Sequence, residues 1–411
     1  MVLSLTEVYM IKLENGWTTT PQGFEAGAAM AGVKKEGRYD VSVIYSSVPA
    51  ACGAVFTQNK FCAAPVLLDR EVNKGAYAQA IVANSGCANA CTGAKGYEDA
   101  VDMQAKTAEL LGIEPQAVFV CSTGVIGAFM PMERINKGIE EAIDVMDENG
   151  GEIAAMGIQT TDTVIKHIAY EGEIGGKKVR FGGIAKGSGM IHPNMATMLT
   201  FITTDAAIAP DVLKRAVKKA ADLSFNMVVV DGDTSTNDSM IVLANGMAEN
   251  EIIVSEDHPD YPAFFEMLLA CAKDLAKKIA YDGEGATKFL EVKVVGAKDF
   301  ADAKKAAMAI AKSPLVKTAI FGEDANWGRI TCAAGYSGAD LDPEKASLTM
   351  GGVCLFENGL NNNVADEIME PIMAQKEISL VMDLAVGEAE ATVWTCDFSY
   401  DYVKINGDYR T

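Results

Sequence analysis

Hydrophobic and polar positions follow two alternating patterns along the chain. Short apolar runs, typical of buried strands, lie at Val41–Tyr45, Ala80–Val82, Ala117–Cys121, Met227–Val230, Leu290–Val295 and Ile378–Met382. Longer stretches with apolar residues at helical spacing lie at Asp99–Leu111, Met132–Met146, Pro210–Leu223 and Asp299–Lys312. Strands interleaved with helices predict an α/β or α+β layered architecture.

The most abrupt change of composition lies between Gly182 and Asp205. The glycine-rich run GGIAKGSGMIHPN gives way to MATMLTFITTD, which predicts a flexible loop followed by a buried strand that opens with Thr197. Threonine favours strands, and this alone accounts for its position. A chemical interpretation is also open. The Thr197 hydroxyl can attack the carbonyl carbon of Ala196 and form an ester, and hydrolysis then frees the α-amine of Thr197.

That α-amine would serve as the base for the hydroxyl nucleophile beside it. Its ordinary pKa of about 7.7–8.0 lies near working pH, where a general base is most effective. A base of this kind fits a chain with only three histidines, His167, His192 and His258. The nine cysteines form no C-x-x-C pair, and no H-E-x-x-H motif occurs, so we expect neither a metal site nor a resident cofactor.

Composition narrows the class of protein. The 411 residues are 49% hydrophobic and 22% charged, which excludes a disordered or fibrous chain. A net charge of −21 disfavours nucleic acid and anionic membranes as partners. No run of about 18 apolar residues is present, and the first residues lack a basic segment followed by an apolar core. We therefore expect a soluble cytoplasmic protein.

Around the Ala196–Thr197 junction, the run KGSGMIHPNMATMLTFITTDA resembles the self-cleavage segment of the ornithine acetyltransferase family of arginine biosynthesis, the glutamate N-acetyltransferases. Six further motifs resemble the family's pattern in the family's order: ANSGCANACTG (83–93), STGVIG (122–127), QTTDT (159–163), GEGATKF (283–289), NWGRI (326–330) and INGDYRT (405–411). Together they span nearly the whole chain. The resemblance implies an α/β fold of the N-terminal-nucleophile kind and a chain that cleaves itself.

The resemblance also implies a role for each matching residue. Thr197 is the nucleophile, and cleavage between Ala196 and Thr197 leaves residues 1–196 as an α chain and 197–411 as a β chain. Thr123 and Gly124 match the pair that forms the oxyanion hole. The substrate-binding positions are Thr160, Lys186, Thr197, Glu284, Asn406 and Thr411. Thr161 follows Thr160, so this assignment is uncertain by one residue. The resemblance further implies that the C-terminal end folds back into the site.

The implied function is transfer of an acetyl group from N-acetylornithine to glutamate by a ping-pong mechanism, with release of ornithine. Acetyl-CoA is a possible second donor. The chains would assemble as a heterotetramer of two α and two β. Two alternatives stay open: a self-processing aminopeptidase or amidase, and a non-catalytic binding protein on the same scaffold. The segment DGDTSTND (231–238) superficially resembles a calcium loop, but Thr236 and Val242 replace the glycine and glutamate that such a loop needs, so we exclude calcium there.

Overall fold

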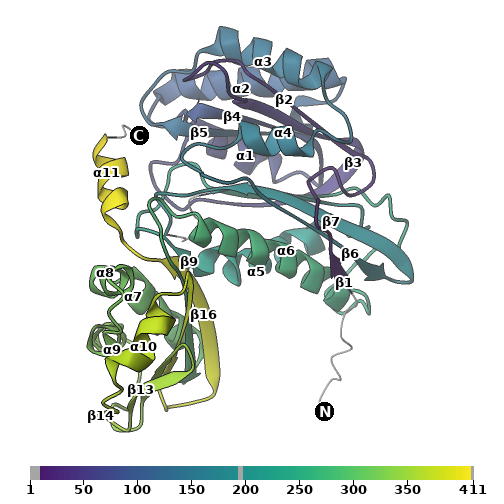
Figure 1. The fold of residues 1–411 in the computed structure, drawn as a ribbon. Coiled ribbons are helices and arrows are strands. Elements are labelled where there is room, and N and C mark those ends of the chain that lie inside the picture. The colour runs from purple at the N-terminus through teal and green to yellow at the C-terminus, as the bar shows by residue number, and fades with distance from the viewer. Residues whose placement is uncertain (1–9, 193–197, 409–411) are drawn as a thin grey trace.

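The computed structural model describes residues 10–192 and 198–408 (Figure 1). Its larger sheet has nine strands among these residues, in the order β1-β6-β7-β8-β10-β3-β4-β5, with β2 also paired to β3. Their bounds are β1 Met10–Lys12, β2 Phe24–Ala29, β3 Val41–Phe56, β4 Tyr77–Cys87, β5 Val118–Val125, β6 Lys166–Ile174, β7 Lys177–Lys186, β8 Leu199–Thr204 and β10 Ser239–Ala244.

The long strand β3 divides this sheet into two halves. Its first part pairs with β2 and β4, its last part pairs with β10, and its register against β4 shifts between Tyr45 and Ala50. The two halves enclose a core that includes Phe24, Phe119 and Phe201. Both faces of each half are covered, so these strands are apolar on both sides rather than alternating.

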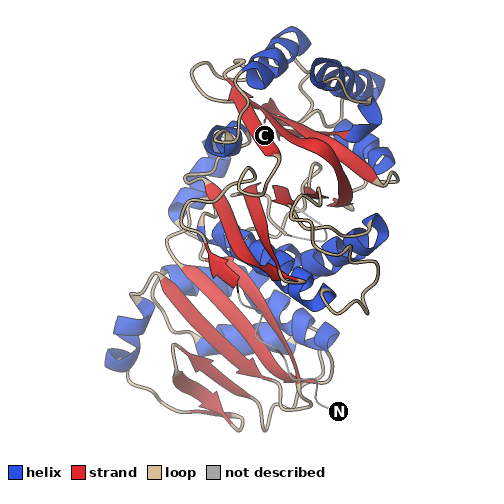
Figure 2. Ribbon diagram, turned by 90° about the vertical axis from the view of Figure 1, so that its right-hand side faces the viewer, coloured by secondary structure: helices blue, strands red, loops and turns tan. Residues whose placement is uncertain are grey.

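Helices cover the outer faces of the two halves (Figures 1 and 2). On β3 to β5 lie α2 and α3, and on β6, β7 and β3 lie α5 and α6. The result is a helix–sheet–sheet–helix stack. The helices of this part are α1 Ala64–Val72, α2 Gly93–Leu111, α3 Met132–Asp144, α4 Gly151–Gly157, α5 Pro210–Asp222 and α6 Tyr261–Tyr281, with short 3₁₀ turns at Pro115–Ala117 and Phe225–Met227.

A second sheet of seven described strands follows, in the order β14-β13-β12-β15-β11-β16-β9. Its bounds are β9 Val228–Val229, β11 Phe289–Ala297, β12 Ser347–Met350, β13 Val353–Glu357, β14 Leu360–Asn361, β15 Glu377–Asp383 and β16 Ala389–Cys396. Its helices are α7 Phe300–Lys312, α8 Pro314–Phe321, α9 Trp327–Gly335 and α10 Asp366–Met373. The last helix, α11 (Tyr400–Asp408), leaves this sheet and returns toward the larger one (Figure 1).

The layered α/β fold predicted from the sequence is confirmed. Each predicted strand overlaps an observed one, and the four predicted helices correspond to α2, α3, α5 and α7. Local signals explain these helix starts: Asp299 caps α7 by accepting a hydrogen bond from the Asp302 N–H, and Pro210 occupies the first turn of α5. In the described part of the chain, no helix is both long and apolar enough to cross a membrane.

Candidate active site

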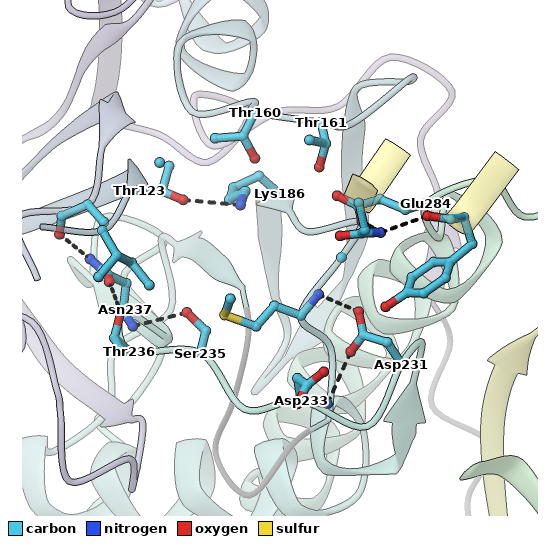
Figure 3. A pocket seen from close by; sticks show the side chains of 17 residues that line it. Thr123, Thr160, Thr161, Lys186, Asp231, Asp233, Ser235, Thr236, Asn237 and Glu284 are labelled. Carbon is cyan, nitrogen blue, oxygen red and sulfur yellow. Dashed lines mark hydrogen bonds between the residues drawn. The ribbon is translucent and has the colours of Figure 1, made fainter. Parts of the chain in front are cut away.

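A cavity of about 140 Å³ opens where the two halves of the larger sheet meet α11. Residues from seven segments line it (Figure 3): Thr123 and Gly124 from the end of β5, Thr160 and Thr161, Lys186 from the end of β7, residues of the loop 231–237, Ala88, Glu284, and Asn406 from α11. Strand ends and loops thus supply the polar groups, and the packed sheet holds them in place.

Gly124 lies in a distortion of the β4–β5 ladder. The pairing register of the two strands is irregular at Gly86 and Cys87, and Gly124 has φ +133°. A Cβ at Gly124 would lie only 2.3 Å from the carbonyl carbon of Gly86, so no other residue fits there without movement of the backbone. Thr123 and Gly124 therefore present a fixed, irregular strand end to the cavity.

The family resemblance implies that the Gly124 N–H is an oxyanion donor, and a Cβ at this position would displace it. Replacement of Gly124 by alanine is therefore expected to lower kcat by at least about 10²-fold, the cost typical of losing one such donor. Gly127→Ala is the matched control, since Gly127 has φ +80° but no atom lies within 4 Å of the position that a Cβ would take there. Steady-state rates of both variants measure the difference. Equal losses of kcat in the two variants would assign the effect to backbone strain and not to the close approach of Gly124 to Gly86.

Lys186 brings a buried cation to the cavity. Its side chain is 9% exposed, and its Nζ donates a hydrogen bond of 3.2 Å to Thr123 Oγ1. Burial lowers the pKa of Lys186, while the nearby Asp162 carboxylate opposes this. Asp162 in turn accepts a 2.7 Å hydrogen bond from the N–H of Gly187, which fixes the chain directly after Lys186. A buried ammonium group that lines a cavity can form a charged hydrogen bond with a carboxylate there.

The lowered pKa of Lys186 predicts a pH effect on substrate binding. The protonated amine binds a carboxylate, and it loses its proton at a pH below the ordinary 10.5. We therefore expect kcat/KM to fall on the alkaline side before pH 10.5 is reached. Lys186→Met should lower kcat/KM by roughly 10- to 100-fold, the value of one charged hydrogen bond, and should remove the alkaline fall. An unchanged fall in this variant would assign the titration to another group.

Glu284 provides the opposite charge. It is 8% exposed, and the side-chain amide of Asn406 donates a 2.9 Å hydrogen bond to its Oε2 (Figure 3). A Cβ at Gly189 would lie 2.2 Å from the same carboxylate, so the glycine leaves room for Glu284. Since α11 carries Asn406, the C-terminal part of the chain does reach the cavity.

The segment 231–237 is the part of the site that sequence reasoning missed. Asp231 accepts hydrogen bonds from the N–H groups of Met190 (2.6 Å) and Ile191 (2.9 Å). Asn237 donates to the carbonyls of Ala88 (2.6 Å) and Ser122 (2.8 Å). The segment therefore ties the chain before residue 193 to the end of β5. Its high content of Asp, Ser, Thr and Asn is the signal that the sequence offers for it.

Three predicted site residues, Ala196, Thr197 and Thr411, lie outside the described residues. Their described neighbours are held near the cavity: the Thr234 hydroxyl donates a 2.9 Å hydrogen bond to the His192 carbonyl, and Met198 accepts one from the N–H of Ser239. The structure brings together the remaining six, Thr123, Gly124, Thr160, Lys186, Glu284 and Asn406. Thr160 and Thr161 both line the cavity, so each stays a candidate contact.

A buried cation and a carboxylate in one cavity suit the two charges of an amino acid, and Thr123 and Gly124, for which the resemblance implies an oxyanion role, line the same cavity. No histidine lines the described part of this cavity. The fold and the site thus define a class: an α/β protein with a pocket for an amino-acid substrate. Sequence comparison then gives the family.

Residues 25–411 match the family model described as the ArgJ family, and the chain belongs to this family. The arginine biosynthesis bifunctional protein ArgJ of Caldanaerobacter subterraneus is 50% identical over 98% of this chain and 100% of its own length. The crystal structure of its namesake from Bacillus halodurans is 41% identical, with a TM-score of 0.49 over 50% of this chain and 97% of that one. Ornithine acetyltransferase from Mycobacterium tuberculosis, solved with ornithine, is 34% identical, with a TM-score of 0.42 over 45% of this chain and 99% of that one. The resemblance stated from the motifs is confirmed.

Proposed function

We propose that this protein is a self-processing acetyltransferase that moves the acetyl group of N-acetylornithine to glutamate in arginine biosynthesis. The observation that carries the proposal is the cavity that holds Lys186 and Glu284 together beside Thr123 and Gly124. Donor and acceptor share an α-amino-acid end. The Lys186 ammonium can therefore hold the α-carboxylate of either substrate, and the Glu284 carboxylate suits the side-chain ammonium of ornithine. The α-nitrogen, acetylated in the donor and free in glutamate, then lies at the same reacting position.

In the proposed mechanism the Thr197 hydroxyl oxygen attacks the acetyl carbonyl of N-acetylornithine, and the α-amine of Thr197 takes the hydroxyl proton. The carbon–nitrogen bond breaks, and ornithine leaves with that proton on its amine. The N–H group of Gly124 and the Thr123 hydroxyl would stabilise the negative oxygen. Glutamate then attacks the acetyl ester through its α-amine and regenerates Thr197. No metal or resident cofactor takes part in this proposal.

Acetyl-CoA is proposed as a second, weaker donor, consistent with the name bifunctional that the relative from Caldanaerobacter subterraneus carries. The same hydroxyl would form the ester while the carbon–sulfur bond breaks, and the CoA thiol would leave with the proton. The net charge of −21 disfavours this polyanionic donor at long range. We expect cytoplasmic location and assembly of two α with two β chains.

Incubation of the enzyme with N-acetylornithine alone is expected to add one acetyl group, about 42 Da, to the chain that begins with Thr197, because covalent catalysis stores the group there. Intact-protein mass spectrometry measures the adduct, and added glutamate should remove it as N-acetylglutamate. Release of free acetate at the same rate without glutamate would favour the amidase alternative. An enzyme with no adduct, and with a rate that requires both substrates at once, would contradict the ping-pong order.

A further inference from the structure

A second cavity, of about 50 Å³, lies next to the active-site cavity. Its lining includes three basic residues, Lys34, Lys35 and Arg38, together with Ser85. Thr160 lines both cavities, so the two adjoin at this residue. A concentration of positive charge is unexpected at this place in a chain that carries a net charge of −21.

The basic loop, residues 30–40 between β2 and β3, packs directly against Gly86, which contacts Gly124 of the active-site cavity. A Cβ at Gly86 would lie 3.2 Å from the backbone nitrogen of Lys34, and Gly86 is also the residue that Gly124 touches. Contacts therefore run from Lys34 through Gly86 to Gly124. A ligand in the basic cavity would lie against the back of the acyl-transfer site.

The loop is held in shape by its own hydrogen bonds. The Asp40 carboxylate accepts from the N–H groups of Ala31 (2.7 Å) and Val33 (2.6 Å), and Arg134 donates to the Gly32 carbonyl (2.6 Å). Arg38 donates to the carbonyl of Gln159, one residue before Thr160. Asp40 is the acidic group in the lining, and both of its oxygens are engaged by the backbone. The exposed Glu36 is the other carboxylate on the loop.

Ser85 gives an independent sign of a ligand. Its side chain is 1% exposed, lines the basic cavity, and its Oγ has no hydrogen-bond partner among the described residues. A buried hydroxyl without a partner is rare in folded proteins, because it has lost its hydrogen bonds to water and gained none in return. A ligand oxygen beside Ser85 would satisfy it.

We propose that the basic cavity binds phosphate groups of acetyl-CoA, with Lys35 and Arg38 as charge partners and the Ser85 hydroxyl as a hydrogen-bond donor. The inference rests on the proposed use of acetyl-CoA as a donor. The arm of CoA between its phosphates and its thioester is a flexible chain. It can enter the active-site cavity beside Thr160 while the phosphates stay in the basic cavity. N-acetylornithine has no phosphate and does not use this site.

The test uses the self-processed full-length enzyme and three variants: Lys35→Glu, Ser85→Ala, and Lys177→Glu as a control. Lys177 is exposed at the start of β7, nine residues from Lys186, or roughly 30 Å along a strand. We expect Lys35→Glu to raise KM for acetyl-CoA about tenfold and Ser85→Ala to raise it severalfold. Both should leave the rate with N-acetylornithine unchanged. Lys177→Glu should change neither, and added salt should raise KM only for acetyl-CoA.

Calorimetric titration with CoA and with inorganic phosphate separates the outcomes. Wild-type enzyme that binds no CoA would overturn this inference and the acetyl-CoA half of the proposed function, while transfer from N-acetylornithine would still stand. CoA binding that is equal in wild type, Lys35→Glu and Ser85→Ala would overturn the site alone. Inorganic phosphate that binds as tightly as CoA would identify a plain phosphate site and overturn the donor assignment.

Discussion

Replacement of Thr197 by alanine is expected to yield a chain that stays intact at 411 residues and transfers no acetyl group. Alanine has no hydroxyl, so neither the attack on the Ala196 carbonyl nor the later attack on the acetyl donor can occur. On a denaturing gel the wild type should give two bands, of 196 and 215 residues. The variant should give one.

Thr197→Ser is the matched control, because serine keeps the hydroxyl. It should still cleave, more slowly, and N-terminal sequencing of its second band should begin with serine. Efficient cleavage of the alanine variant would exclude Thr197 as the self-processing nucleophile. In the cleaved wild type and the cleaved serine variant the two parts should stay associated, since β7 pairs with β8 and β3 pairs with β10 across the proposed cleavage position.

Secondary structure could be predicted where its cause is local. The apolar run at Ala117–Cys121 became β5, and the capped pattern after Asp299 became α7. Strand β3 was only partly predicted. The apolar run Val41–Tyr45 was recognised, but Ser46, Ser47 and Pro49 interrupt the pattern where the strand bends between the two halves of the sheet. Tertiary packing maintains the strand conformation through this interruption.

The site depends on contacts between distant parts of the chain. Thr123, Lys186, Glu284 and Asn406 share no local pattern, and only their resemblance to a family's motifs pointed to one pocket. Asp231 was missed because its role, holding the N–H groups of Met190 and Ile191, appears only in three dimensions. The same holds for the buried ion pair of Lys166 with Asp282, whose residues lie 116 positions apart.

The ion pair of Lys166 also positions the chain segment that follows Lys186 in the site. The Nζ of Lys166 lies 2.6 Å from Asp162 Oδ1 and 2.5 Å from Asp282 Oδ2, and the lysine side chain is fully buried. Asp162 also binds the N–H of Gly187, and the Asp282 carbonyl accepts a 2.6 Å hydrogen bond from Ser188. One buried cation thus holds two carboxylates whose residues position the chain at Gly187 and Ser188.

Lys166→Met is expected to destabilise the protein by about 3–5 kcal/mol at neutral pH, because it leaves two buried carboxylates without their shared cation. Although burial raises the pKa of Asp162, Lys166 and Lys186 bring it down to about 2 from its ordinary 3.8. In the wild type this pairing stabilises the fold above pH 3.8 and is lost as the pH falls toward 2. The variant's deficit should therefore be largest near pH 7 and should shrink below about pH 4, where protonation removes the unpaired charge.

Urea unfolding of wild type and Lys166→Met at pH 7 and at pH 3.5 measures this difference. Lys74→Met is the control, because the pair of Lys74 with Glu71 is exposed and contributes little. A deficit of equal size at both pH values would mean that Lys166 acts through packing of its side chain rather than through its charge. A deficit that narrows with acid, together with reduced acetyl transfer at neutral pH, would show that the buried charge keeps Lys186 in place.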